Sequence, residues 1–270
     1  MLIGRLTESE IAKLTAEWCA APWRLIAERP LPPALNVALD EVLSDRIGRG
    51  ESPPALRFWR WSAPAIVLGR CQSAANEVDP DAAAALGMTV VRRITGGGAM
   101  FVQPHGAITY SLILPERFVE GLTLRQSYEI CDAWAVSGLR GMGIDCFYRE
   151  VNDIACAAGK IAGAAQARRR GVVLHHTTMA YALDPTEMLR VLRIGRTKLK
   201  ERGVASAAKE VAALDLQTSL TREAMASGLL DAFRERYGGT LGELSAEELT
   251  EAEGLAETKY GRAEWTNEFE

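Results

Sequence analysis

Three consecutive glycines at 96–98 follow the strand-like run TVVRRI and precede AMF. Glycine has no side chain, so the backbone N–H groups of such a segment can approach a bound ligand closely. Thr95 adds a hydroxyl group beside the glycines. Arg92 and Arg93 occupy adjacent strand positions, so their side chains point to opposite faces and only one of them can face the ligand. No GKS, GKT or GxGxxG pattern accompanies the glycines, which leaves two interpretations open, an anion-binding loop or a flexible turn.

A second candidate is the segment NDIACAAGKIAGAAQARR at 152–169. Lys160 is flanked by Gly159 and Ile161, with Gly163 close behind, so little side-chain bulk surrounds its ammonium group. Such a lysine can reach a phosphate or carboxylate as a point charge. Asp153 can orient this lysine or bind Mg²⁺, although an Asn-Asp pair is most often a turn or a cap.

Histidines and cysteines give weaker indications. In the run LHHTTMAY, the side chains of His175 and His176 face opposite sides of a strand and cannot bind one metal together. The five cysteines contain no CxxC pair, which favours reduced thiols over a disulfide framework or a zinc site. A cysteine nucleophile needs a nearby base or positive field, so we expect most of these thiols to be packing residues.

Length and composition restrict the function classes. The 270 residues are 48% hydrophobic and 24% charged, as in an ordinary globular protein. The net charge of −4 excludes a broadly basic nucleic-acid surface. The sequence contains neither an uninterrupted apolar run of about 18 residues nor the apolar core of a signal peptide, so we expect a cytoplasmic protein without membrane contact.

Hydrophobic patterning predicts an α+β fold with a mixed, largely antiparallel sheet flanked by helices and a short helical C-terminal extension. The irregular order of elements excludes a doubly wound sheet. A hairpin is expected across 169–171, and the charged stretch at 190–215 is expected to separate a catalytic domain, 1–214, from a small helical segment, 215–270. The expected strands are 56–61, 65–70, 89–94, 107–114, 143–150, 160–168 and 172–182, and the expected helices are 33–43, 79–86, 123–141, one from 184 and those after 215.

Taken in order, the segments WR, VLGRCQ, RRITGGGAMF, ITYSL, ND, GKIAGAAQAR and LHHTTMAY resemble the lipoate-protein ligase family over about 31–210. A further segment, ETKYGRAEW at 257–265, is similar to the family's C-terminal ending. The resemblance implies the mixed sheet that this family shares with biotin-protein ligases and octanoyltransferases. Ordered matches in five or more segments are far more specific than one glycine loop.

The resemblance also implies a reaction. Lipoate or octanoate would attack the α-phosphate of ATP, with Mg²⁺, releasing pyrophosphate. The acyl-adenylate would then pass its acyl group to a lysine of a carrier domain, such as an E2 subunit or a glycine-cleavage H-type protein, forming an amide and releasing AMP. Lys160 and Arg93 would stabilise the charge at the α-phosphate, Asp153 would bind Mg²⁺, and Trp59, Val67 and Ile94 would line a slot for the acyl tail. The other implied substrate- and adenylate-binding residues are Gly69, Arg70, Thr95, Gly96, Gly97, Gly98, Ala99, Asn152, Gly163, His176 and Thr177.

Two departures from the family pattern matter. Val102 and Gln103 stand where family ligases commonly carry His-Asp, so contacts of that pair cannot be transferred. The roughly 55 residues after Asp215 are too few for the accessory domain of the longer ligases. Either this tail suffices, or a separate accessory protein supplies the missing function.

Three alternatives remain. An octanoyltransferase on the same fold would take the acyl chain from a carrier-protein thioester through a cysteine, and Cys146-Phe147 partly matches the Ala-Cys-Phe of such enzymes. The ligase-like Asn152-Asp153, where those transferases tend to carry Pro-Ser, favours the ligase. A biotin ligase fits less well, because its glycine loop differs. A non-catalytic acyl-binding protein would not need Lys160, Arg93 and Asp153 together.

Overall fold

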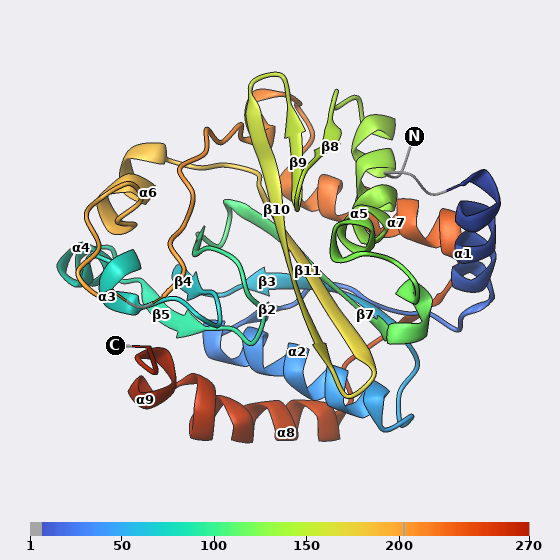
Figure 1. Ribbon diagram of the computed structural model, residues 1–270, viewed down its shortest axis with the longest axis horizontal. Helices are drawn as coiled ribbons and strands as arrows, with labels where there is room; N and C mark the ends of the chain where they lie inside the picture. The colour runs from blue at the N-terminus through green and yellow to red at the C-terminus, as the bar shows by residue number, and fades with distance from the viewer. Residues whose placement is uncertain (1–6, 202, 270) are drawn as a thin grey trace.

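The protein, described here from a computed structural model, folds around a mixed nine-stranded sheet (Figure 1). The structure describes residues 7–201 and 203–269. The strand order is β12-β1-β3-β7-β11-β10-β9-β8, with β2 beside β3. Pairs that involve β1 or β2 are parallel and the rest are antiparallel, which confirms the predicted α+β fold class. The strands are β1 (Arg24–Ile26), β2 (Pro30–Leu31), β3 (Ala55–Trp61), β7 (Ala107–Pro115), β8 (Phe147–Arg149), β9 (Asp153–Cys156), β10 (Gly159–Arg169), β11 (Val172–Ala180) and β12 (Thr240–Gly242).

A small second sheet carries the glycine segment. Its strands are β4 (Ala65–Leu68), β5 (Thr89–Arg92) and β6 (Met100–Val102), in the order β5-β4-β6. The glycines at 96–98 connect β5 to β6 and lie outside both strands. We call residues 95–99 the glycine loop. Because the flanking strands pair with the same partner, both ends of this loop are fixed.

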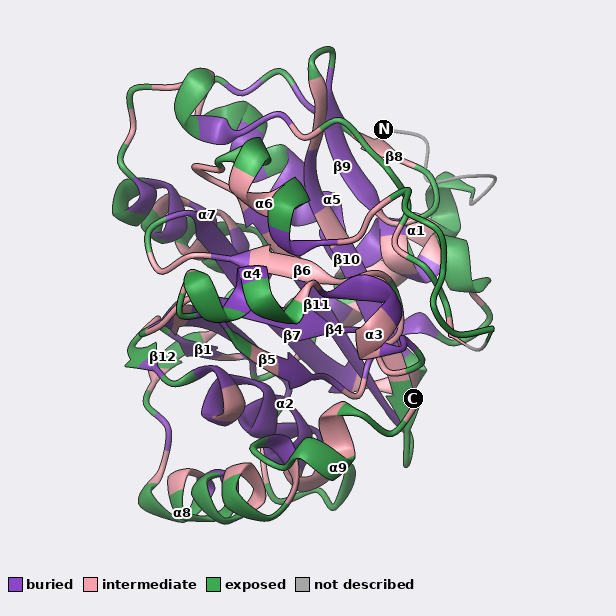
Figure 2. Ribbon diagram, turned by 90° about the vertical axis from the view of Figure 1, so that its left-hand side faces the viewer, coloured by how far each residue is buried: buried purple, intermediate pink, exposed green. Residues whose placement is uncertain are grey.

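Helices cover both faces of the large sheet. α5 (Leu124–Gly141), α7 (Arg222–Tyr237) and α1 (Glu8–Ala20) lie on one face, and α2 (Pro33–Gly48) and α8 (Ala246–Leu255) lie on the other (Figures 1 and 2). The remaining helices are α3 (Ala74–Glu77), α4 (Pro80–Ala85), α6 (Pro185–Val191) and α9 (Ala263–Thr266). None of the helices in the described ranges is long and apolar enough to cross a bilayer.

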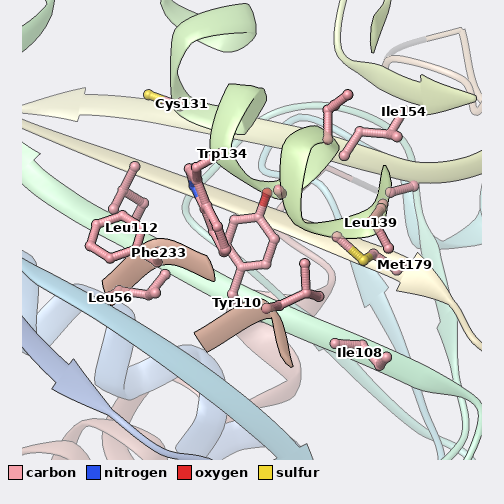
Figure 3. Packing of buried hydrophobic residues seen from close by; sticks show 14 of the residues in the cluster. Leu56, Ile108, Tyr110, Leu112, Cys131, Trp134, Leu139, Ile154, Met179 and Phe233 are labelled. Carbon is pink, nitrogen blue, oxygen red and sulfur yellow. The ribbon is translucent and has the colours of Figure 1, made fainter. Parts of the chain in front are cut away.

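Successive side chains of β7 point alternately into two hydrophobic cores, one on each face of the large sheet. Tyr110 and Leu112 pack with Trp134 of α5 and Phe233 of α7 (Figure 3), whereas Ile113 packs in the core on the α2 side. Successive strand side chains point to opposite faces, so a strand covered by helices on both sides is apolar throughout. The same alternation decides which side chains of β11 reach the functional site.

The predicted hairpin is confirmed. β10 and β11 pair antiparallel, and Arg170 and Gly171 form the turn with φ of 52° and 75°. Positive φ at both central residues is the pattern of a type I′ hairpin turn, and glycine adopts such a φ without strain. The structure adds elements that the patterning did not predict, namely α1, α3, β1, β2, β6, β9 and β12. In the 215–270 segment, α7 packs into the large core and β12 pairs with β1, so this segment contains a strand besides its helices.

Candidate active site

A cavity of about 350 Å³ lies between the glycine loop, the first residues of β10, the middle of β11 and a segment that we call the strap, residues 194–201 and 203–211. This volume lies in the range of small-molecule sites. Its polar lining includes Arg93, Asn152, Lys160, His176 and Lys209. Apolar side chains supply much of the remaining wall, among them Met100, Ile161, Met179, Leu183, Met188, Leu192 and Ile194.

Asp153 is the centre of the charged part of the site. Its side chain is 1% exposed, and Lys160 Nζ lies 2.9 Å from its Oδ1. Lys209 donates a hydrogen bond to Oδ2, and Arg149 Nη2 lies 3.8 Å from the same oxygen. Burial lowers the pKa of Lys160, while the carboxylate of Asp153 opposes that shift and the charge of Lys209 adds to it. One buried carboxylate therefore holds several cations together.

The glycine at 163 makes room for Lys160. A Cβ atom on Gly163 would lie 2.4 Å from Lys160 Nζ and 2.8 Å from Cε. Asn152 binds β10 next to Gly163, since its Nδ2 donates a hydrogen bond to the carbonyl oxygen of Ala164 at 2.6 Å. Lys160, Asn152 and Gly163 were all singled out from the sequence, and the structure brings them together.

The strap lies over the cavity and is hydrogen-bonded to the rest of the protein at several places, two of which meet the site. Near its C-terminal end, the carbonyl oxygen of Glu210 accepts a hydrogen bond from the backbone N–H of Lys160 at 2.8 Å. Further back, Ser206 Oγ accepts from Ala99 N at 2.8 Å and from Gln72 Nε2 at 3.1 Å. The strap thus contacts both the glycine loop and the β10 lysine. The strap lies within the charged stretch at 190–215 and forms a wall of the site.

Arg93 positions the glycine loop. Its guanidinium donates to Thr95 Oγ1 at 2.8 Å and to the carbonyl oxygens of Val67, Gly96 and Gly98 at 2.8, 2.5 and 2.8 Å. Burial lowers the pKa of Arg93 to about 10. Four of its five N–H donors bind the protein itself, so in this conformation Arg93 fixes the shape of the loop that lines the cavity. Its expected role toward a phosphate stays a prediction.

A closed network continues from this loop into the core. His176 Nε2 lies 2.7 Å from Thr95 Oγ1, and His176 Nδ1 lies 3.2 Å from Asp40 Oδ2. Asp40 also accepts from Ser111 Oγ at 2.7 Å and from Arg57 Nη1 at 3.2 Å. Burial lowers the pKa of His176, against the opposing effect of Asp40. His176 is therefore held neutral, and it links the glycine loop to α2.

The structure corrects the expected acyl slot. Trp59 and Val67 are buried in the core on the α2 side, and Ile94 packs against that core, so none of them lines the cavity. Trp59 Nε1 donates to Ser111 Oγ at 2.8 Å. Odd-numbered positions of β3 face α2, and sequence alone could not assign that face. The apolar wall comes instead from β6, β11 and the region around α6.

Five other residues expected at the site do not line the cavity. Thr177 faces α5, where its hydroxyl donates to Asp132 at 2.8 Å, and its neighbour Thr178 lines the cavity instead. Arg70 binds Glu268 at 2.7 Å and lies over the ring of Trp265. Gly69 supports the glycine loop from behind, since a Cβ atom there would lie 2.1 Å from the carbonyl oxygen of Gly97. Gly97, Gly98 and Ala99 do line the cavity, whereas Gly96 and Thr95 do not.

Cys146 is fully buried in the core against α5 and does not line the cavity. Its thiol donates to the carbonyl oxygen of Val136, with a sulfur–oxygen distance of 3.7 Å. Burial raises its pKa to about 11, which disfavours the thiolate that a nucleophile requires. In this conformation Cys146 is a packing residue.

The donor set does not fit Mg²⁺ at Asp153. Both carboxylate oxygens already face ammonium groups. Among the described residues, no group of three or more His, Cys, Asp or Glu side chains could hold a metal ion. The expected metal role of Asp153 is therefore not supported, and its geometry is that of a lysine-orienting carboxylate.

Sequence reasoning missed Lys209 and Ser206. Both lie in the strap, which meets the site 49 residues after Lys160, and no motif or periodicity marked them. Val102 and Gln103, noted as departures, lie beside the site. Val102 is buried in the core, and Gln103 Nε2 donates to Glu187 at 2.8 Å.

Comparison with known proteins identifies the family. A model of the lipoyl protein ligase A/B catalytic domain matches residues 32–234, about three quarters of the chain. The chain belongs to this family. This assignment confirms the resemblance drawn from the glycine, lysine and histidine segments.

Similar proteins in the family carry two kinds of name. An octanoyltransferase LipM from Symbiobacterium thermophilum is 32% identical over 273 residues, covering 90% of this chain and 97% of the relative. One from Geobacillus kaustophilus is 30% identical with the same coverage. Among solved structures, a bi-partite lipoate protein ligase from Thermoplasma acidophilum superposes with a TM-score of 0.77 at 25% identity, covering 93% of this chain and 98% of that one. A lipoate-protein ligase A bound with ATP gives 0.76 at 25% identity, covering 93% and 100%.

Proposed function

We propose that this chain transfers an octanoyl or lipoyl group to a lysine of a lipoyl-accepting carrier domain, such as an E2 subunit or a glycine-cleavage H-type protein. The observation that carries the proposal is a largely apolar cavity whose charged part contains Lys160 and Lys209 around one buried carboxylate. A thin fatty acid needs apolar walls along its tail and a cation at its acidic head group. Family membership and the named relatives support the same general reaction.

The geometry favours activation of the free acid as an acyl-adenylate. ATP would supply the activating phosphate, and the residues present fit a phosphate group. Lys160 and Lys209 bring positive charge to the cavity, and the glycine loop brings backbone N–H groups close to it. Lys160 would hold the acid and the phosphate oxygens while charge develops. The strap would exclude water from the adenylate. No step is assigned to Mg²⁺, since Asp153 is already paired.

A second route is an octanoyltransferase that uses Cys146 and needs no ATP. The names of the relatives at about 30% identity favour this route over the ligase. The burial of Cys146 and its raised pKa favour the ligase route. For the second route, the chain around β8 would have to open and expose the thiol to an acyl thioester.

Intact-mass measurement of a purified lipoyl domain separates the two routes. In one arm the protein receives octanoate or lipoate with and without ATP and Mg²⁺, and in the other it receives octanoyl carrier-protein thioester. We expect a mass gain in the first arm only with ATP, and no loss of this gain in Cys146→Ser. Gain from the thioester, abolished by Cys146→Ser but not by Cys71→Ser at an exposed cysteine, would establish the transferase instead.

A third arm supplies preformed octanoyl-adenylate and tests the transfer half alone. Transfer from the adenylate without activation of the free acid would indicate that a separate accessory protein completes the ligase. The bi-partite ligase from Thermoplasma acidophilum makes this arrangement reasonable. Folded protein that modifies the lipoyl domain in none of the three arms would overturn the proposed function.

A further inference from the structure

Lys209 is a cation of the site that no family motif in this sequence supplied. It lies on the strap, lines the cavity described above, and also lines a second, polar pocket beside Asp153 and Gly159. Its side chain is 32% exposed, close to the 26% of Lys160, while the carboxylate that both contact is 1% exposed. Both ammonium groups are therefore partly open to the cavity.

The charges around Asp153 do not balance. Lys160, Lys209 and Arg149 share one carboxylate, which leaves two positive charges without a partner within this cluster. Arg149, at 41% exposure, lines the second pocket but not the first cavity and can be hydrated. Surplus positive charge in a largely apolar cavity is stabilised by an anion that enters it.

Backbone hydrogen bonds between the end of the strap and β10 hold Lys209 beside Asp153. The carbonyl oxygen of Glu210, the next residue, accepts from Lys160 N at 2.8 Å, and Ala212 N donates to Lys160 O at 2.8 Å. The backbone of the strap thus runs alongside the first residues of β10. This arrangement places the two lysines beside each other.

We propose that Lys209 binds the anionic head group of the acyl substrate together with Lys160. The inference rests on the proposed function and assigns a residue and a ligand chemistry within it. The ligand is a linear carboxylic acid or its phosphoryl ester. Its tail would contact the apolar wall at Met179, Leu183, Met188 and Leu192. Its head group would take the place of Asp153 as the partner of the Lys209 ammonium group.

Calorimetric binding of octanoate and of octanamide tests this proposal, because the two ligands share a tail and differ in head-group charge. In Lys209→Met we expect the Kd for octanoate to rise about tenfold, since a charge-assisted hydrogen bond is lost. The Kd for octanamide should stay within about twofold. Lys209→Arg should recover most of the affinity for octanoate. Lys200→Met, at an exposed position of the same strap, should leave both ligands unaffected.

A purely structural role for Lys209 gives a different result. If it only neutralises Asp153, Lys209→Met would lower the thermal midpoint and weaken both ligands equally, or neither. Either pattern would overturn the proposal. Failure of the proposed function is distinguishable, because wild-type protein would then bind octanoate with the expected dependence on Lys209 and still leave the lipoyl domain unmodified.

Discussion

Two of the buried aspartates, Asp40 and Asp153, differ in charge balance. Asp40 and its cationic partner Arg57 are 3% and 2% exposed, and the other partners of Asp40 are the neutral groups of Ser111 and His176. Asp153 is equally buried, but its lysines are 26% and 32% exposed and outnumber it. The Asp40 cluster is closed and balanced, whereas the Asp153 cluster is open and carries surplus positive charge.

The difference separates positioning from binding. A balanced, fully buried network has no unmet charge to offer a ligand, but it fixes geometry, here that of the glycine loop through His176 and Thr95. A cluster with surplus charge at a cavity gains stability when a ligand of opposite charge arrives. Substitutions in the first cluster should therefore cost mainly stability, and those in the second mainly activity.

The largest effect is expected from Arg57→Met. It leaves Asp40 as a buried charge without its cation, which should lower the free energy of unfolding by about 3–5 kcal/mol. Denaturant unfolding monitored by tryptophan fluorescence measures this loss. The matched control is Arg49→Met, which removes an exposed pair with Glu51 and should cost no more than about 1 kcal/mol. Equal losses in both variants would contradict the contrast between the two clusters.

Lys160→Ala should have the opposite signature. Acyl transfer is expected to fall about 10²–10³-fold, the usual effect of removing one group that stabilises developing charge. The thermal midpoint should barely change, because Lys209 and Arg149 still neutralise Asp153. The mass assay and a melting curve measure the two quantities. Stability loss comparable to that of Arg57→Met would show that Lys160 is mainly structural.

Gly163→Ala tests the placement of Lys160 without removing it. The new methyl group would displace the lysine ammonium, whose Nζ lies 2.4 Å from the added Cβ position. We expect about tenfold slower acyl transfer, with stability nearly unchanged because a flexible side-chain end can move. Gly254→Ala in α8, where no atom lies within 4 Å of the added Cβ, is the control and should preserve full activity. Full activity in Gly163→Ala would mean that the observed position of Lys160 is not required.

The smallest effect concerns pH and the closed cluster. Burial lowers the pKa of His176, so below about pH 6.5 the unfolded chain binds a proton that the folded chain does not. This contribution to stability is present above pH 6.5 and is lost as pH falls further, by up to about 1.4 kcal/mol per pH unit. Unfolding measured at pH 7.5, 6.5 and 5.5 should show a shallower decline in His176→Gln than in the wild type. Parallel declines would exclude His176 as the source.

Much of this contrast could be predicted from the sequence. The fold class, the β10–β11 hairpin and the position of Lys160 follow from local patterning and motif order. Strand alternation also correctly separated His175 from His176. The same alternation places Thr178, and not Thr177, on the face of β11 that carries His176 and lines the cavity.

Other parts depend on contacts distant in the sequence. The face of β3 that receives Trp59 is decided by its pairing with β7 and by the packing of α2, which no local pattern contains. Lys209 reaches Asp153 through a strap without regular structure, 56 residues along the chain. The donors of Arg93 bind carbonyl oxygens of the glycine loop, which the sequence could not distinguish from a free cation facing a ligand.

The edge of the large sheet has a consequence for how the chain folds as it is made. β1 pairs with β12, so this parallel edge of the sheet can form only after residues 240–242 have been synthesised. Trp18 and Trp23 likewise pack with Phe233 and Tyr237 of α7. During synthesis on the ribosome, aromatic groups and an unpaired strand edge near the N-terminus therefore remain uncovered until most of the polypeptide has emerged. Such surfaces favour association between nascent chains, and we expect newly made protein to depend on chaperones more than its finished stability would indicate.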